Sequence, residues 1–340
     1  MLTHILRRIL AAVPMLIAIS IASFLLLQAL PGDPTAALLG QQATEENMAS
    51  MRHELGLDRP LPVQYIDFVG DALQGDFGRS YFTNQDVSTE LKQRIPATVE
   101  LALAAMILAT IMGVSLGILA SIKPRSIWDF ICLFIALTGV SMPIFWLGFL
   151  LQQLFAGDMG LVPFGGRFNE AGWQGFQPET GFYIYEAIFT YHSPALTFEL
   201  LHHLALPAFV LATVPMALIA RMTRASMLEV LDQDYIRTAR AKGLASTPVV
   251  VRHAMRNALI PVITSIGTQF GYLLGGAVLT ETIFNWPGMG RYVVDAVIRL
   301  DGKPLQASVL IIATFFVLIN LLTDISYSII DPRLRHRGRK

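Results

Sequence analysis

Charged residues are scarce in this chain of 340 residues. Asp, Glu, Lys and Arg make up only 15% of it, whereas hydrophobic residues make up 54% and the mean hydropathy is +0.54. Soluble globular domains carry about 25% charged residues. The composition therefore excludes an ordinary soluble fold and favours a membrane protein.

Cysteine and the common cofactor motifs are also nearly absent. Cys132 is the single cysteine, so the chain can form neither an internal disulfide nor a thiolate metal cluster. The nucleotide-binding pattern G-x-x-x-x-G-K-[ST], the H-E-x-x-H pattern and the calcium-loop spacing do not occur. We therefore expect no metal, no cofactor and no ATP hydrolysis by this chain itself.

What the chain does have is long apolar stretches that contain no charged residue. Each runs for 20 to 28 residues, and there are six: 9–30, 101–122, 130–157, 200–220, 257–280 and 304–323. A helix of about 20 apolar residues spans a bilayer. The pattern predicts an all-α integral membrane protein with six transmembrane helices. We interpret the first as a retained helix rather than a signal peptide, because it is too long and no A-x-A-like site follows it.

Basic residues are distributed unequally between the two sides that six alternating spans define. One side holds the N-terminus, 123–129, 221–256 and the C-terminal tail, with 16 basic and 6 acidic residues; the other holds 9 basic and 19 acidic residues. Cytoplasmic loops carry the excess of Lys and Arg. Both termini are therefore expected in the cytoplasm. The net charge of zero is the sum of +10 on the cytoplasmic side and −10 on the other side. It therefore follows from the topology and does not indicate a nucleic-acid partner.

The loops divide the chain into three expected regions. Residues 1–95 comprise the first span and an exported segment with helix-like stretches at 46–55 and 61–74; residues 96–330 form the core with five spans; residues 331–340 form a basic cytoplasmic tail. In the last exported loop, Trp286-Pro287-Gly288 predicts a turn, and 291–300 is typical of a short amphipathic helix.

One segment matches a catalytic motif. Gly113-Val114-Ser115-Leu116-Gly117 fits the G-x-S-x-G nucleophile pattern, and an intramembrane protease would need Ser115 with His202 or His203 as base. That pattern requires a strand, a turn and a helix, whereas this pentapeptide lies inside an apolar span. Glycines four residues apart in a membrane helix favour close helix packing instead, which we expect at Gly113 and Gly117.

The cytoplasmic stretch 221–256 is charged and regularly patterned. Helical character extends from Arg221 to Lys242, Gly243 and Pro248 interrupt it, and an amphipathic run resumes at 249–256. The positive-inside bias accounts for the charge of this stretch but not for its ordered break. The pattern predicts a helix, a short turn and a second helix.

This stretch resembles the coupling loop of binding-protein-dependent ABC importer permeases, in the form found in their peptide branch. D-Y-I-R-T-A-R-A-K-G-L occupies 234–244, and H-A-M-R-N-A-L-I-P occupies 253–261. Arg237 and Thr238 depart from the wider pattern E-A-A-x₃-G. Further matching motifs are PGDP at 31–34, ELGLD at 54–58, GDFGRS at 75–80, RIPATVEL at 94–101 and ETIFNWPGMGR at 281–291.

The resemblance is closest to the dipeptide permeases and covers nearly the whole chain. It implies the type I ABC importer permease fold with a cytoplasmic coupling helix, located in the bacterial inner membrane. It also implies a second, homologous permease, two ATPase subunits and an external binding protein as partners, with a peptide as substrate and membrane lipid around the spans. Permeases of this family for nickel, glutathione or haem are the alternative interpretation.

Two sets of residues are expected to carry the function. A short helix that docks in a groove of another subunit presents one face and needs close approach at its end; the expected ATPase contacts are Arg240, Ala241, Gly243, Leu244 and Ala245. In the fifth span, Gly267, Gly271 and Gly275 form a small-residue packing row beside the polar row Thr264, Thr268 and Tyr272. The polar row could line the translocation pathway, or its Thr hydroxyls could bond their own helix backbone.

Overall fold

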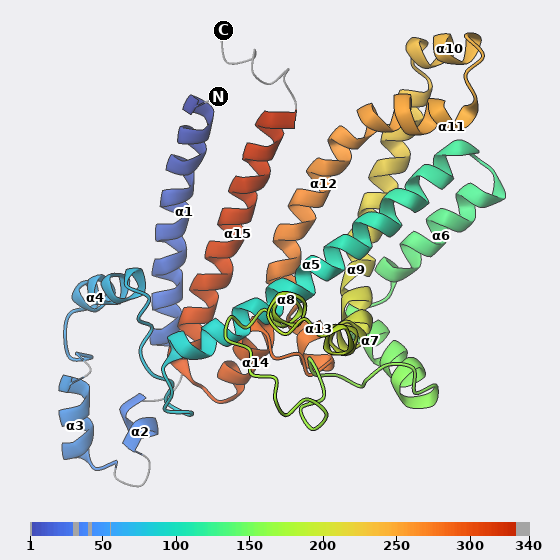
Figure 1. Cartoon of the computed structure of the whole chain (residues 1–340). Coiled ribbons are helices and arrows are strands. Elements are labelled where there is room, and N and C mark those ends of the chain that lie inside the picture. The colour runs from blue at the N-terminus through green and yellow to red at the C-terminus, as the bar shows by residue number, and fades with distance from the viewer. Residues whose placement is uncertain (1, 30–33, 40–42, 55, 331–340) are drawn as a thin grey trace.

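The structure is a computed structural model that describes residues 2–29, 34–39, 43–54 and 56–330. Every regular element within these ranges is a helix (Figure 1). In chain order they are α1 (Leu2–Ala29), α2 (Pro34–Leu39), α3 (Glu45–Glu54), α4 (Leu61–Leu73), α5 (Val87–Ile122), α6 (Ile127–Ser141), α7 (Ile144–Gln152), the π-helical turn η2 (Gln153–Asp158), α8 (Tyr183–Phe189), α9 (Pro194–Leu231), α10 (Asp234–Ala241), α11 (Ser246–Pro248), the π-helical turn η3 (Val249–Ala254), α12 (Met255–Gly276), α13 (Val278–Ile283), α14 (Met289–Ile298) and α15 (Gly302–Ile330).

The all-helical membrane architecture expected from the sequence is confirmed, but the count of six spans is not. In the described part of the chain, four helices are long and apolar enough to cross a membrane: Arg8–Gln28 within α1, α5, α9, and Gly302–Thr323 within α15. A bent pair, α6 with α7 and η2, raises the number to five if it is one span. The stretch 257–280 covers most of α12 and the first half of α13, and neither helix is among these.

The stretch 130–157 is not the single straight span that its lack of charge predicted. It breaks between Ser141 and Ile144, and the two halves are bent by 102°. The cause is Pro143, because a proline disfavours helical backbone at the residue before it. Met142 accordingly has ψ 139°, and Pro143 is the N-cap of α7, which starts at Ile144.

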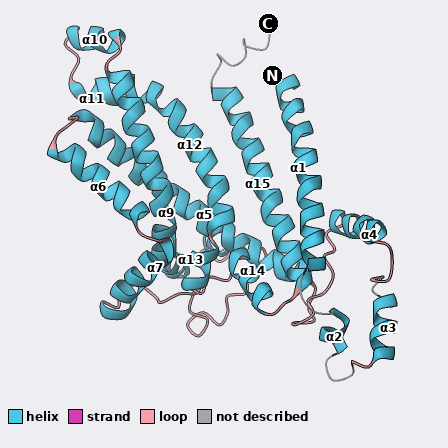
Figure 2. Cartoon of the chain, turned by 180° about the vertical axis from the view of Figure 1, so that it is seen from behind, coloured by secondary structure: helices cyan, strands magenta, loops and turns pink. Residues whose placement is uncertain are grey.

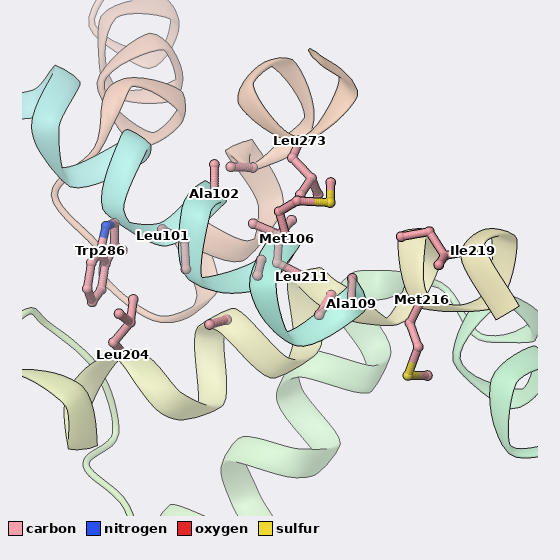
Figure 3. Packing of buried hydrophobic residues seen from close by; sticks show 14 of the residues in the cluster. Leu101, Ala102, Met106, Ala109, Leu204, Leu211, Met216, Ile219, Leu273 and Trp286 are labelled. Atoms are coloured by element: carbon pink, nitrogen blue, oxygen red, sulfur yellow. The ribbon is translucent and has the colours of Figure 1, made fainter. Parts of the chain in front are cut away.

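The core of the protein lies where α5 and α9 pack together. Alanines on α5, among them Ala102 and Ala109, are fully buried, and their small side chains let the helices approach closely. Figure 3 shows Met106 of α5 between Leu211 of α9 and Leu273 of α12. The core thus joins three helices that are far apart in sequence.

The helices on the exported side of the predicted topology form as expected. Of the stretch 46–55, residues 46–54 lie in α3 and residue 55 lies outside the described residues. The stretch 61–74 lies in α4 up to Leu73, and the predicted helix at 291–300 lies mostly in α14. Both views of the chain place α2–α4, α13 and α14 at one end, whereas α10 lies at the other (Figures 1 and 2). α1 begins and α15 ends at the same end as α10.

Candidate functional site

The segment with the coupling-loop motif forms the short helix α10 at the tip of the molecule (Figure 1). The helix expected from Arg221 to Lys242 is interrupted, because α9 ends at Leu231 and Gln233 adopts extended backbone with ψ 148°. Asp232, just before the break, accepts a hydrogen bond from Arg237 Nη2 at 2.9 Å. This ion pair bridges the break between α9 and α10, and both of its side chains are largely exposed.

The predicted break was placed correctly at Gly243 and incorrectly at Pro248. Gly243 has φ +79°, a conformation that residues with a side chain rarely adopt. Its amide donates to Arg240 O at 3.0 Å and ends α10. Pro248 instead lies inside α11, because a proline is tolerated in the first turn of a helix.

α10 is attached to the core by one apolar side. Ile236 is fully buried and Ala239 nearly so, in a cluster with Met227 of α9, Val249 of η3 and Ala258 of α12. The cluster ties α10 to the ends of both long helices. A displacement of α10 would therefore be transmitted to α9 and α12 together.

The opposite side and the end of α10 are exposed. All five residues expected at the ATPase contact are exposed, and they follow one another at the end of α10 and in the turn beyond it: Arg240, Ala241, Gly243, Leu244 and Ala245. Leu244 is a large hydrophobic residue with 42% of its surface exposed. A Cβ added at Gly243 would meet no atom of this chain within 4 Å.

The two predicted rows of α12 differ in how closely they pack against other helices. A Cβ at Gly267 would lie 2.3 Å from Thr323 Cγ2, and one at Gly271 would lie 3.4 Å from Phe316, so this row faces α15. The surroundings of Gly275 lie outside the described residues. In the polar row, Thr268 and Tyr272 are exposed and Thr264 is half-buried.

The threonines of that polar row bond to their own helix. Thr264 Oγ1 donates to Ile260 O at 3.2 Å, and Thr268 Oγ1 donates to Thr264 O at 3.1 Å. Each hydroxyl oxygen keeps acceptor capacity. The surface of α12 beside Tyr272 can therefore offer hydrogen-bond acceptors to a polar solute.

The glycines of the G-x-S-x-G segment lie against α9. A Cβ at Gly113 would lie 2.8 Å from Met216 O, and one at Gly117 would lie 2.6 Å from Ala220 O. Ser115 is therefore level with the stretch that begins at Met216, which is about 20 Å along α9 from His203. His202 contacts Leu161 O at 2.7 Å, and His203 contacts Gly165 O at 3.1 Å. Neither histidine can act as a base for Ser115.

A buried carboxyl joins two motifs that the sequence analysis treated separately. Glu281, on α13, is fully buried and accepts hydrogen bonds from Thr98 Oγ1 at 2.6 Å and from Arg291 N at 3.0 Å. Burial raises the pKa of Glu281, which lies outside the candidate spans, to about 7. Trp286 Nε1 donates to Ala97 O at 2.8 Å. These bonds fix α13 and α14 against α5.

Two further ion pairs lie near opposite ends of the core. The buried Arg167 pairs with Glu100 of α5, and its guanidinium carbon lies 3.4 Å from the centre of the Tyr183 ring. Near the α10 end, Arg224 of α9 donates hydrogen bonds to Asp129 of α6 from Nε and Nη2, at 2.7 and 2.6 Å. Sequence reasoning missed both, because each joins residues more than 60 positions apart.

Comparison with known proteins identifies the family to which this arrangement of helices belongs. Residues 113–336 match the binding-protein-dependent transport system inner membrane component, and residues 1–102 match the N-terminal component of the same systems. The chain belongs to this permease family. The family and the apolar helices place the chain in a membrane, as the subunit of a transport system.

Individual permeases match over their full length. The dipeptide transport system permease protein DppB of Alkalihalophilus pseudofirmus is 46% identical over 336 residues, which is 99% of this chain and 100% of that protein. The di/tripeptide transport system permease protein DppB of Pseudomonas aeruginosa is 44% identical over 338 residues, with the same coverage. The glutathione transport system permease protein GsiC of Salmonella choleraesuis is 39% identical over 338 residues, also 99% and 100%.

Proposed function

We propose that this chain is the membrane-spanning permease subunit of an ABC importer for dipeptides or short peptides. The observation that carries the proposal is the exposed end of α10, formed by the peptide-branch motif and attached by Ile236 to α9 and α12. The identity of 44–46% with dipeptide and di/tripeptide permeases supports the cargo class.

The proposed partners follow from what the chain carries and from its family. Two ATPase subunits bind and hydrolyse ATP, since this chain has no nucleotide motif. A second, homologous permease completes the pore, and an external binding protein delivers the peptide. The chain lies in the bacterial inner membrane with both termini in the cytoplasm, on the same side as α10.

Coupling is proposed to pass through packed helices rather than through a chemical step. A groove on the ATPase receives the residues from Arg240 to Ala245, and closure of the ATPases on nucleotide moves α10. Because Ile236 and Ala239 are buried against α9, η3 and α12, the displacement reaches these helices together. Hydrogen bonds of Glu281 and Trp286 to α5 connect the packed helices to the segment of α13 and α14 at the end away from α10.

The translocation pathway is proposed to run along the polar row of α12. Thr264, Thr268 and Tyr272 present hydroxyl groups on the side of α12 next to the row of Gly267 and Gly271, and the ring of Tyr272 lies 6.0 Å from that of Phe316 on α15. Weak, repeated hydrogen bonding of this kind suits a solute that must bind and leave again. The row then requires the second permease to close it off from lipid.

The cargo is tested by uptake in cells. A strain that lacks its own peptide permeases is supplied with this chain, its partner subunits and its binding protein, and the uptake of a labelled dipeptide is measured. Uptake that requires this chain and is suppressed by unlabelled dipeptides is expected. Suppression of the uptake by unlabelled glutathione, but not by unlabelled dipeptides, would instead indicate glutathione as the cargo, which is the cargo named for the 39% identical relative.

A further inference from the structure

Helix α4 has an apolar side that no part of the described chain covers. Val63, Ile66 and Leu73 are spaced three and seven residues apart, so they lie on one side of the helix. Ile66 is 67% exposed and Leu73 is 84% exposed. Three large apolar side chains in a row, two of them mostly exposed, mark an interaction surface.

The other sides of α4 have different partners. Tyr65 and Phe68 pack against Phe24 of α1, with ring centres 5.6 and 6.0 Å apart. Asp67 and Asp71, one turn apart, form a polar side, on which Asp67 pairs with Arg59 at 3.2 Å. α4 therefore has a protein-facing side, a charged side and an uncovered apolar side.

The contacts with α1 fix the depth of α4. Tyr65 Oη lies 2.7 Å from Ser20 Oγ, and Gln28 Nε2 donates to Gln64 Oε1 at 3.4 Å. Ser20 and Gln28 belong to the apolar span Arg8–Gln28, which is about 30 Å long and so matches the hydrocarbon core of a bilayer. α4 thus meets α1 over the last turns of the span, about 12 Å or less from its end.

α4 lies across α1 rather than along it, and it does so at the end away from α10 in both views (Figures 1 and 2). A helix at this depth and in this direction lies along the boundary between the hydrocarbon core and the lipid headgroups. Over the same turns α1 itself exposes Ile21 and Leu25. The apolar side of α4 therefore continues a surface that faces lipid.

We propose that α4 is an interfacial membrane anchor, with Val63, Ile66 and Leu73 inserted among the lipids of the leaflet farther from α10. Its charged side then faces water, as in amphipathic helices that lie at membrane surfaces. The anchor holds the exported end of α1 and the segment around α3 at a fixed depth relative to the membrane. The inference depends on the membrane location and is independent of the cargo.

Nitroxide accessibility in the assembled transporter tests this proposal. Cys132 is replaced by Ala, and single cysteines are placed at Ile66, Leu73, Asp67 or Asp71 and spin-labelled in the complex reconstituted into liposomes. Collisions of the nitroxide with oxygen, which concentrates in lipid, are compared with collisions with a water-soluble nickel chelate. Ile66 and Leu73 are exposed, so a label there displaces no packed side chain.

The expected oxygen-to-nickel ratio is several-fold higher at Ile66 and Leu73 than at the neighbouring Asp67 and Asp71. High nickel accessibility at all four positions would overturn the proposal, because the apolar side would then face water. Low accessibility to both reagents at Ile66 and Leu73 would also overturn it, because another protein subunit, rather than lipid, would then cover the side.

Discussion

At the scale of single residues, the buried carboxyl of Glu281 forms the joint between α5 and the pair of α13 and α14. Its oxygens accept hydrogen bonds from Thr98 and Arg291 N, and a Cβ at Gly288 would lie 2.4 Å from the carboxylate. Only a residue without a side chain can stand beside it. Gly288 of the Trp286-Pro287-Gly288 turn therefore leaves room for the side chain of Glu281.

The stability of this joint should depend on pH. Burial raises the pKa of Glu281 from 4.5 to about 7, so the folded state holds a proton that the unfolded state has lost. Its stabilising contribution is therefore present at low pH and disappears as the pH rises through 7; between pH 6 and pH 8 it falls by roughly 1 kcal/mol. Thermal unfolding of the purified permease should occur at a higher temperature at pH 6 than at pH 8.

The variant Glu281→Gln cannot ionise and serves as the control. Its unfolding temperature should vary less between the two pH values than that of the wild type. It should also be lower at pH 6, because the amide nitrogen faces a donor where an oxygen accepted a bond. An equal pH dependence of both proteins would show that Glu281 is not the titrating group.

At the scale of elements, the contact of α5 with α9 depends on glycine. Replacing Gly117 by Ala places a Cβ 2.6 Å from Ala220 O and from Thr223 Cβ, so the helices must separate. Overpacking of this kind costs about 1–3 kcal/mol, which exceeds the helix-propensity gain of about 1 kcal/mol from Gly to Ala. Gly117→Ala should therefore lower the thermal unfolding temperature in detergent.

Gly70→Ala is the matched control for this substitution. Gly70 lies within α4, and a Cβ there would meet no atom within 4 Å. It carries the same gain in helix propensity without the clash, so its unfolding temperature should equal or exceed that of the wild type. Similar behaviour of the two variants would contradict the close packing of α5 against α9.

The elements also show what could be predicted from sequence. Runs of apolar residues located α1, α5, α9 and α15, and turn residues marked the end of α10 at Gly243. The bend at Pro143 was missed because lack of charge was weighed above the backbone effect of proline. The contact of Glu281 with Thr98 was missed for another reason: it joins residues 183 positions apart, and local patterns hold no information on such pairs.

At the scale of the whole molecule, the proposed coupling to an ATPase requires α10 and both ends of the chain to lie in the cytoplasm. A reporter that is active only there, fused after Lys123, after Gly243 or at the C-terminus, should be active at all three positions. The basic residues on that side supply the physical reason. Activity after Gln74, beside α4 at the opposite end, would reverse the orientation.

The central claim is that α10 couples ATP hydrolysis by partner subunits to peptide import. Gly243 and Gly75 allow a matched comparison, because each follows the end of a helix, each has φ +79° and a Cβ at either meets nothing within 4 Å. Substitution by Asp therefore strains the backbone equally at both. Only at Gly243 would the carboxylate also be placed in the proposed ATPase groove.

The deciding measurement is dipeptide uptake and binding-protein-stimulated ATP hydrolysis in the same liposomes, with the wild type, Gly243→Asp and Gly75→Asp. Uptake and stimulated hydrolysis should fall together by roughly tenfold or more in Gly243→Asp, since an unpaired carboxylate in a desolvated groove costs more than about 1.4 kcal/mol. Gly75→Asp should stay near the wild type. Equal activities of the two variants would contradict the account.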